Sequence, residues 1–130
     1  MVAARWLVGL ALLASCSKEP TGGPSTAANP REATIAAWKT AGLSPSAFAA
    51  TQVAVGKDCQ SGTVSGVDVV VCTYASDAEA KAAEEAGLAW VGETTGMAQA
   101  RGKVLVAAAD RKKADPQGKT INSLMKLAGK

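Results

Sequence analysis

Histidine is absent from this chain of 130 residues, and its absence removes several kinds of catalytic site. Nucleophile–base pairs of the Ser–His and Cys–His type need an imidazole, so they are excluded. The segment Gly118–Thr120 looks like the end of a phosphate-binding loop, but that motif needs a glycine where Lys113 stands. The G-x-G-x-x-G signal of dinucleotide-binding proteins is also missing. We therefore predict a protein that is not an enzyme and that carries no cofactor and no metal ion.

Long apolar runs at the start of the chain are missing as well. The apolar stretch Trp6–Ala14 covers only nine residues, whereas a helix that crosses a membrane needs about 20. Arg5 precedes this stretch, and small residues end it. A positive start, a short apolar centre and small residues before a cut are typical of a secretory signal peptide. The sequence therefore predicts export.

Four residues at the end of this stretch, Leu13-Ala14-Ser15-Cys16, resemble the processing signal of bacterial lipoproteins. The resemblance implies cleavage before Cys16, which would carry a thioether-linked diacylglycerol and an amide-linked acyl chain such as palmitate. In that family an Asp after the cysteine often means retention in the inner membrane. Ser17 therefore favours the outer membrane, on its periplasmic or surface face, in an organism that has one. The alternative is an ordinary signal peptide, for which Ala14-Ser15-Cys16 is a poor cleavage site.

Composition divides the chain into a signal peptide (1–15), a lipid-anchored linker (16–29) and one globular domain (30–130). The linker is rich in Pro, Gly, Ser and Thr and has no large apolar side chain, so we expect a flexible spacer. Removal of the signal peptide leaves 13 basic side chains (14 less Arg5) against 11 acidic ones. A chain so close to neutral is not expected to bind nucleic acid.

The domain begins with a helix that has clear end signals. Asn29 is a good capping residue, Pro30 suits the first helical position, and Glu32 follows three residues after the cap. Gly42 suits the left-handed residue that ends a helix. We expect Trp38 of this helix in the core, and a short turn after Gly42.

A hairpin of about residues 51–75 follows, with two cysteines in it. Ser65-Gly66 is a credible two-residue turn between segments rich in β-branched residues. This turn places Cys59 opposite Cys72 at a non-hydrogen-bonded position, where side chains approach most closely. Because an exported protein meets oxidising conditions, we predict a Cys59–Cys72 disulfide; the alternatives are free thiols or a metal pair. The disulfide's face is expected to be the outer one, with the core on the other.

Helices and one further strand complete the predicted domain. An Ala-rich helix over Ser76–Gly87 should place a stripe of small residues (Ala78, Ala82 and Ala86) against the sheet. A buried strand over about 103–109 should pair with residues 97–100 through an Arg101-Gly102 turn. A last helix should start after Asp115. Together these elements predict an α+β fold, a small antiparallel sheet with helices packed on one face.

Few polar residues of the domain stand out as site candidates. Arg111, Lys112 and Lys113 form a basic run and are candidate contacts to an anionic surface, although a solvated turn is the simpler interpretation. Asp110, at a strand end, is expected to support the turn that follows. Trp90 is expected in the core.

The expected function follows from the anchor and from the missing chemistry. We expect a lipid-anchored protein of the cell envelope that contacts membrane lipid through acylated Cys16. Its domain should bind or scaffold another component, an envelope protein or a wall polymer. Two other classes stay open: a structural subunit of the surface or envelope, and a small hydrolase-type enzyme that works without histidine.

Overall fold

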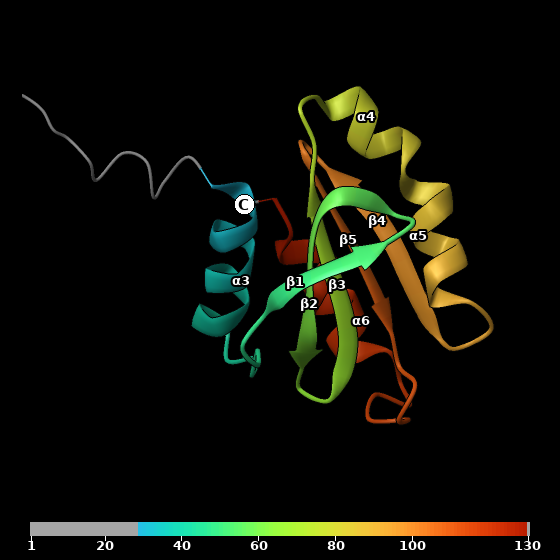
Figure 1. The fold of residues 1–130 in the computed structure, drawn as a ribbon. Helices are drawn as coiled ribbons and strands as arrows, with labels where there is room; N and C mark the ends of the chain where they lie inside the picture. The colour runs from blue at the N-terminus through green and yellow to red at the C-terminus, as the bar shows by residue number, and fades with distance from the viewer. Residues whose placement is uncertain (1–28, 130) are drawn as a thin grey trace, which may run out of the picture.

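An antiparallel sheet of five strands lies at the centre of residues 29–129, the part of the chain that this computed structural model describes. The strands lie in the order β1-β2-β3-β5-β4, and the predicted α+β class is confirmed (Figure 1). The strands are β1 (Ala49–Val53), β2 (Gly56–Val64), β3 (Val67–Thr73), β4 (Gly96–Arg101) and β5 (Val104–Ala109). The helices are α3 (Pro30–Thr40), α4 (Asp77–Ala82), α5 (Glu84–Val91) and α6 (Lys119–Leu127).

The β2–β3 hairpin has the predicted turn and register. Ser65 and Gly66 form the turn with φ angles of 51° and 89°. Such left-handed residues match the twist of the two strands, which is why two-residue hairpins favour them. The register that this turn sets places Cys59 opposite Cys72. Local turn chemistry is therefore sufficient to specify the centre of the sheet.

Helices cover both faces of the sheet, so the prediction of helices on one face is wrong. Trp38 of α3 and the apolar face of α6 pack on one face, while Val91 of α5 packs on the other. In Figure 1, α3 lies to the left of the sheet, and α4 and α5 lie to its right. The reason lies in β3, where Val69 and Val70 point to opposite faces and are both fully buried. A sheet that is apolar on both faces must be covered on both, and the disulfide's face is a second core.

The helix α3 has the predicted ends. The Asn29 side chain accepts hydrogen bonds from the backbone N–H groups of Arg31 (3.1 Å) and Glu32 (3.2 Å). Two of the donors that a helix start leaves unpaired are thereby satisfied. Gly42 follows the last turn with a φ of 93°, as expected of the residue that ends a helix.

Trp38 joins α3 to α6. Its side chain is fully buried, as predicted. The indole N–H donates to the Leu124 carbonyl at 3.0 Å. Leu124 lies in the last turn of α6, where carbonyls run out of partners within the helix. One side chain therefore fills the core between the sheet and the helices α3 and α6, and it satisfies a buried carbonyl group.

The Ala-rich segment forms two short helices in place of the single helix predicted. Ser76 caps α4, because its hydroxyl accepts from the Glu79 N–H at 3.1 Å. The helix breaks at Ala83, which is both the C-cap residue of α4 and the N-cap residue of α5. The second helix continues beyond the predicted end at Gly87 to Val91.

The predicted packing of the alanine stripe on the sheet is also wrong. Ala78 and Ala82 are exposed, and Ala86 is half-buried. Ala80, Gly87 and Val91 are the buried positions of these helices. A Cβ on Gly87 would lie 2.8 Å from the Ala98 side chain of β4, so the helix backbone approaches the sheet closely there. This approach turns the stripe away from the sheet.

The predicted pairing of β4 with β5 is confirmed, with the turn displaced by one residue. Arg101 pairs with Val104, so the turn is Gly102-Lys103 and not Arg101-Gly102. Gly102 has a φ of 61° at the first turn position, which glycine adopts without strain.

Two boundaries differ from the sequence expectation. The edge strand β1 (Ala49–Val53) was not predicted as a separate strand. The sequence predicts residues 51–53 in the hairpin of about 51–75, but they belong to β1. The helix α6 begins at Lys119, later than predicted. The Asp115 carboxylate accepts from the Ile121 N–H at 2.9 Å, so it supports the first turn of α6 from outside the helix.

Candidate functional site

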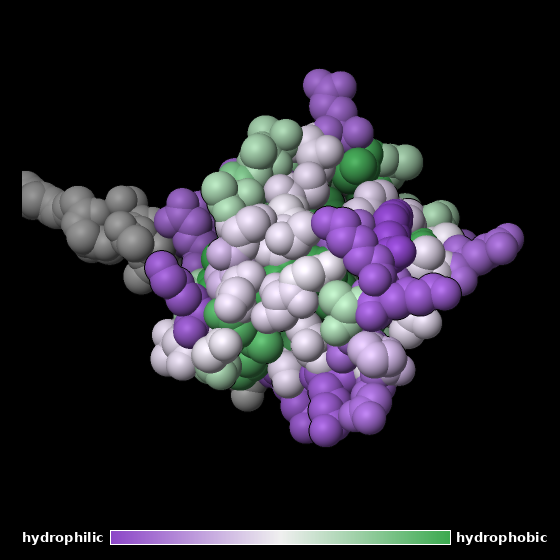
Figure 2. Space-filling view, turned by 90° about the horizontal axis from the view of Figure 1, so that it is seen from below, coloured by the Kyte–Doolittle hydropathy of each residue, from purple (hydrophilic) through white to green (hydrophobic). Residues whose placement is uncertain are grey.

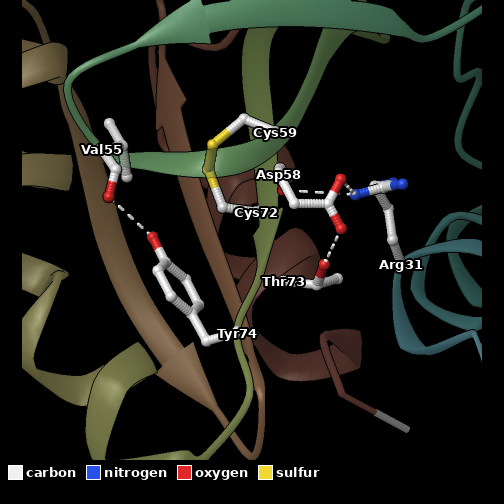
Figure 3. The surroundings of a disulfide bond; sticks show 7 residues. All are labelled: Arg31, Val55, Asp58, Cys59, Cys72, Thr73 and Tyr74. Carbon is white, nitrogen blue, oxygen red and sulfur yellow. Dashed lines mark hydrogen bonds and ion pairs between the residues drawn. A yellow bond between two sulfur atoms is a disulfide. The ribbon is translucent and has the colours of Figure 1, made fainter.

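Cys59 of β2 and Cys72 of β3 form the predicted disulfide on the α5 side of the sheet (Figure 3). The sulfurs are 2.04 Å apart and the Cα atoms 4.1 Å apart. So short a Cα separation is typical of a non-hydrogen-bonded antiparallel pair. Both residues are buried. Since solvent does not reach them, the bond has a structural role.

Asp58, next to the disulfide, joins the sheet to α3. Its carboxylate accepts hydrogen bonds from the Arg31 guanidinium at 3.1 Å and from the Thr73 hydroxyl (Figure 3). The bond from Thr73 is the main cause that lowers the pKa of Asp58 below its ordinary value of 3.8. Burial acts in the opposite direction, and the hydrogen bond and charge of Arg31 lower the pKa further. The carboxylate therefore stays ionised at neutral pH.

We expect Asp58→Asn to lower the free energy of unfolding at neutral pH by less than about 1 kcal/mol. The effect is small because this side chain is 63% exposed and solvent screens its ion pair. Since the folded-state pKa is lowered, the contribution is present above the unfolded-state pKa and is lost as the pH falls through the folded-state pKa. The stability gap should therefore close in acid, as urea unfolding at stepwise lower pH would measure. Glu85→Gln, an exposed carboxylate outside this cluster, is the control; a pH-independent gap would contradict the assignment.

A cavity of about 490 Å³ opens beside Asp58, between the β1–β2 turn, the end of β3 and α4. The Tyr74 hydroxyl donates to the Val55 carbonyl at 2.8 Å and ties the end of β3 to that turn (Figure 3). Burial raises the pKa of Tyr74 above its ordinary value of 10.0, so the phenol stays neutral at physiological pH. The cavity is lined by Gly56, Lys57, Asp58, Thr73, Tyr74, Ala75, Glu79 and Ala82.

A second cavity, of about 280 Å³, lies further along α5. It adjoins the first one, because Val55, in the β1–β2 turn, precedes Gly56, and Ala86 of α5 lies four residues after Ala82, the last residue of α4. We call the two cavities together the α4–α5 groove, with a polar end at Lys57 and an apolar end. The apolar end is lined only by apolar residues: Val53, Ala54, Val55, Ala86, Ala89 and Trp90.

Trp90 belongs to the wall of the apolar end and is held by Arg111. The guanidinium lies 4.6 Å from the centroid of the indole ring and donates to the Trp90 carbonyl at 2.8 Å. Arg111 also lies 4.0 Å from the Asp68 carboxylate. The ring is half-buried and packs on the second core, so the predicted burial is found only in part.

The basic run is divided by these contacts. Arg111 is engaged with Trp90 and Asp68, whereas Lys112 and Lys113 are exposed. Figure 2 views the molecule from the end that carries the β2–β3 turn, where hydrophilic side chains gather in separate clusters with less polar surface between them. Contact of the run with an anionic surface stays a prediction.

Asp110 has the predicted role between strand and turn. Its carboxylate is buried at the end of β5 and accepts from the N–H groups of Ala114 (2.7 Å) and Asp115 (2.8 Å). Both oxygens are thereby used to hold the loop before α6, so this acid lies in a structural network.

Thr73 and Asp58 line the polar cavity, but their side chains bond to each other on the α3 side of the sheet, and the lowered pKa of Asp58 makes its carboxylate a weak base. Within residues 29–129, no group of three or more His, Cys, Asp or Glu side chains is placed to hold a metal ion. In the same range, no helix is long and apolar enough to cross a membrane.

No model of a known protein family, no curated protein and no solved structure matches this chain. The groove and the sequence that precedes the domain are therefore the features of the chain that bear on its function. The anchor candidate Cys16 lies outside the described residues, and so does the rest of its motif.

The groove was not predicted from the sequence. The sequence predicts Ala82 and Ala86 in the packing of a helix on the sheet, and Trp90 in the core. The structure places the apolar run Val53-Ala54-Val55 at the turn between β1 and β2, where the sequence predicts a strand of the hairpin. Apolar residues at a turn are unusual enough to indicate a contact beyond the strand itself.

Proposed function

We propose that this protein is a lipid-anchored lipoprotein of the cell envelope, and that its domain binds an apolar ligand without performing chemistry on it. The sequence Leu13-Ala14-Ser15-Cys16 supports the anchor. The buried Cys59–Cys72 bond agrees with an oxidising compartment. The open groove supports a binding role.

The single observation that carries the binding role is the apolar end of the groove. Small-molecule sites are concave and mostly apolar, with a few polar groups at fixed places. The α4–α5 groove has this arrangement, since an apolar cavity adjoins one with Lys57, Glu79 and Tyr74 in its wall. A purely structural subunit would have no need of such an opening, and a hydrolase would need a better base than Asp58.

Cys16→Ala tests the anchor. We expect the variant to accumulate as uncut precursor and to take up essentially no labelled fatty acid, because the thiol that carries the diacylglycerol is missing. Membrane fractionation and metabolic labelling with palmitate measure both effects. Ser17→Ala, one residue further on, should still be cut and acylated. A Cys16→Ala protein that is cut at the same bond and labelled would refute the proposal.

A further inference from the structure

We infer that the α4–α5 groove takes one acyl chain of a zwitterionic phospholipid. The chain lies along Ala86 and Ala89, and the headgroup lies at Lys57. This inference rests on the proposed function, because the lipid anchor is what brings the domain to a membrane. Three features support it: the backbone carbonyls of the groove that already accept hydrogen bonds, the charges of its polar end, and the place at which the chain enters the domain.

The apolar end favours an aliphatic chain over a peptide. An extended peptide brings an N–H and a C=O with each residue, and each needs a partner when buried. The Val55 carbonyl already accepts from Tyr74, and the Trp90 carbonyl already accepts from Arg111. These two carbonyls are thus already partnered, and the hydrocarbon part of an acyl chain needs no hydrogen-bond partner.

The helix side of the groove is smooth along its length. Ala82, Ala86 and Ala89 form its row of side chains, each no larger than a methyl group. Ala86 and Ala89 lie about 4.5 Å apart along α5 at 1.5 Å per residue, and Ala82 ends α4 before the break at Ala83. Val53 and Val55 add apolar side chains from the β1–β2 segment, and Trp90 adds its ring from α5. An apolar lining of this kind fits an unbranched chain.

The polar end carries one charge of each sign. Lys57 and Glu79 line the same cavity and are both exposed. Among the ion pairs of residues 29–129, none joins these two side chains. A zwitterionic headgroup presents a phosphate and an ammonium group. The phosphate suits Lys57 and the ammonium suits Glu79, which gives the lipid a preferred direction in the groove.

The chain enters the domain beside the strand that carries Lys57. Arg31, two residues after Asn29, contacts Asp58, the residue after Lys57 in β2, on the α3 side of the sheet. Cys16 lies 13 residues before Asn29, and that length of chain spans at most about 47 Å when fully extended. An anchor at Cys16 therefore keeps the polar end of the groove within reach of the membrane surface.

Photo-crosslinking of the full-length lipidated protein tests the inference. The protein is reconstituted in phosphatidylethanolamine vesicles that contain a trace of the same lipid with a photoactivatable group in one acyl chain. We expect crosslinks in residues 53–55 and 86–90. Ala89→Glu should reduce them about tenfold or more, because a carboxylate in the apolar end costs free energy to bury beside the chain. Ala78→Glu adds the same charge on the exposed side of α4, outside the groove, and should leave the crosslinks unchanged.

The outcomes separate this inference from the proposed function. Ala89 is exposed, so its replacement is compatible with the fold, and Lys57→Glu is a second variant that should weaken labelling from the headgroup side. Crosslinks confined to residues before Asn29, or unchanged by Ala89→Glu, overturn the inference and leave the anchor intact. Groove crosslinks that arise only in Cys16→Ala protein mean that the chain's own acyl group fills the groove, which also overturns it. Failed acylation of Cys16 refutes the proposed function. Crosslinking with soluble lysophosphatidylethanolamine that carries the same photoactivatable group then shows whether the groove binds an acyl chain.

Discussion

Loss of the Cys59–Cys72 disulfide should lower the free energy of unfolding by about 3 kcal/mol. The two residues are 13 apart in the sequence, so the bond closes a short loop and restricts the unfolded chain. For a domain of this size, such a loss shifts the melting temperature by roughly 12–24 °C. Urea unfolding of Cys59→Ala/Cys72→Ala measures it against the oxidised protein.

Reduction of the unmodified protein is the matched experiment. A thiol reductant should lower its unfolding midpoint to near that of the double variant and should leave the variant itself unchanged. The reductant must act on partly unfolded protein, because both sulfurs are buried. Equal unfolding midpoints for the oxidised protein and for reduced protein with two titratable thiols would show that the disulfide contributes nothing to stability.

Trp38→Ala should cost about 3–5 kcal/mol, the largest loss that we expect from one side chain of the domain. The side chain is fully buried between α3, α6 and the sheet, so its removal leaves a large cavity. It also leaves the Leu124 carbonyl without its indole donor. Chemical denaturation followed by far-ultraviolet circular dichroism measures the loss, since fluorescence would change with the indole itself.

Two further variants separate packing from hydrogen bonding. Trp38→Phe keeps much of the apolar volume but removes the donor, and should cost about 1–3 kcal/mol. Trp90→Ala removes the same kind of side chain from a half-buried position and should cost less than Trp38→Ala. Equal losses for Trp38→Ala and Trp90→Ala would mean that burial does not govern the difference.

The parts of the fold that could be predicted depend on neighbouring residues. The Ser65-Gly66 turn needs left-handed backbone at adjacent positions, and once it forms, the pairing of Cys59 with Cys72 follows by counting. Asn29 caps α3 through atoms two and three residues away. In such cases the chemistry and the geometry lie in the same short segment.

The parts that were missed depend on distant residues. Whether Ala82 or Gly87 faces the sheet is decided by the close contact of α5 with β4, which periodicity alone does not contain. Both residues are small, and small residues suit close packing and open surfaces equally well. The groove draws on the β1–β2 turn, the end of β3 and two helices, so no single segment indicates it. The same applies to Arg111, whose contact with Trp90 spans 21 residues.

For a protein exported as we propose, the position of the disulfide in the central hairpin would also link folding to the timing of export. Before oxidation the chain has two free thiols there, and the ratio of folded to unfolded molecules is lower by roughly a hundredfold. A newly made chain in a reducing compartment would therefore visit its unfolded state far more often, and an unfolded chain is the form that can be threaded through a narrow translocation channel. Once thiols oxidise, the same bond makes unfolding rare. In an exported protein, the Cys59–Cys72 bond would therefore form after transport and stabilise the fold from then on.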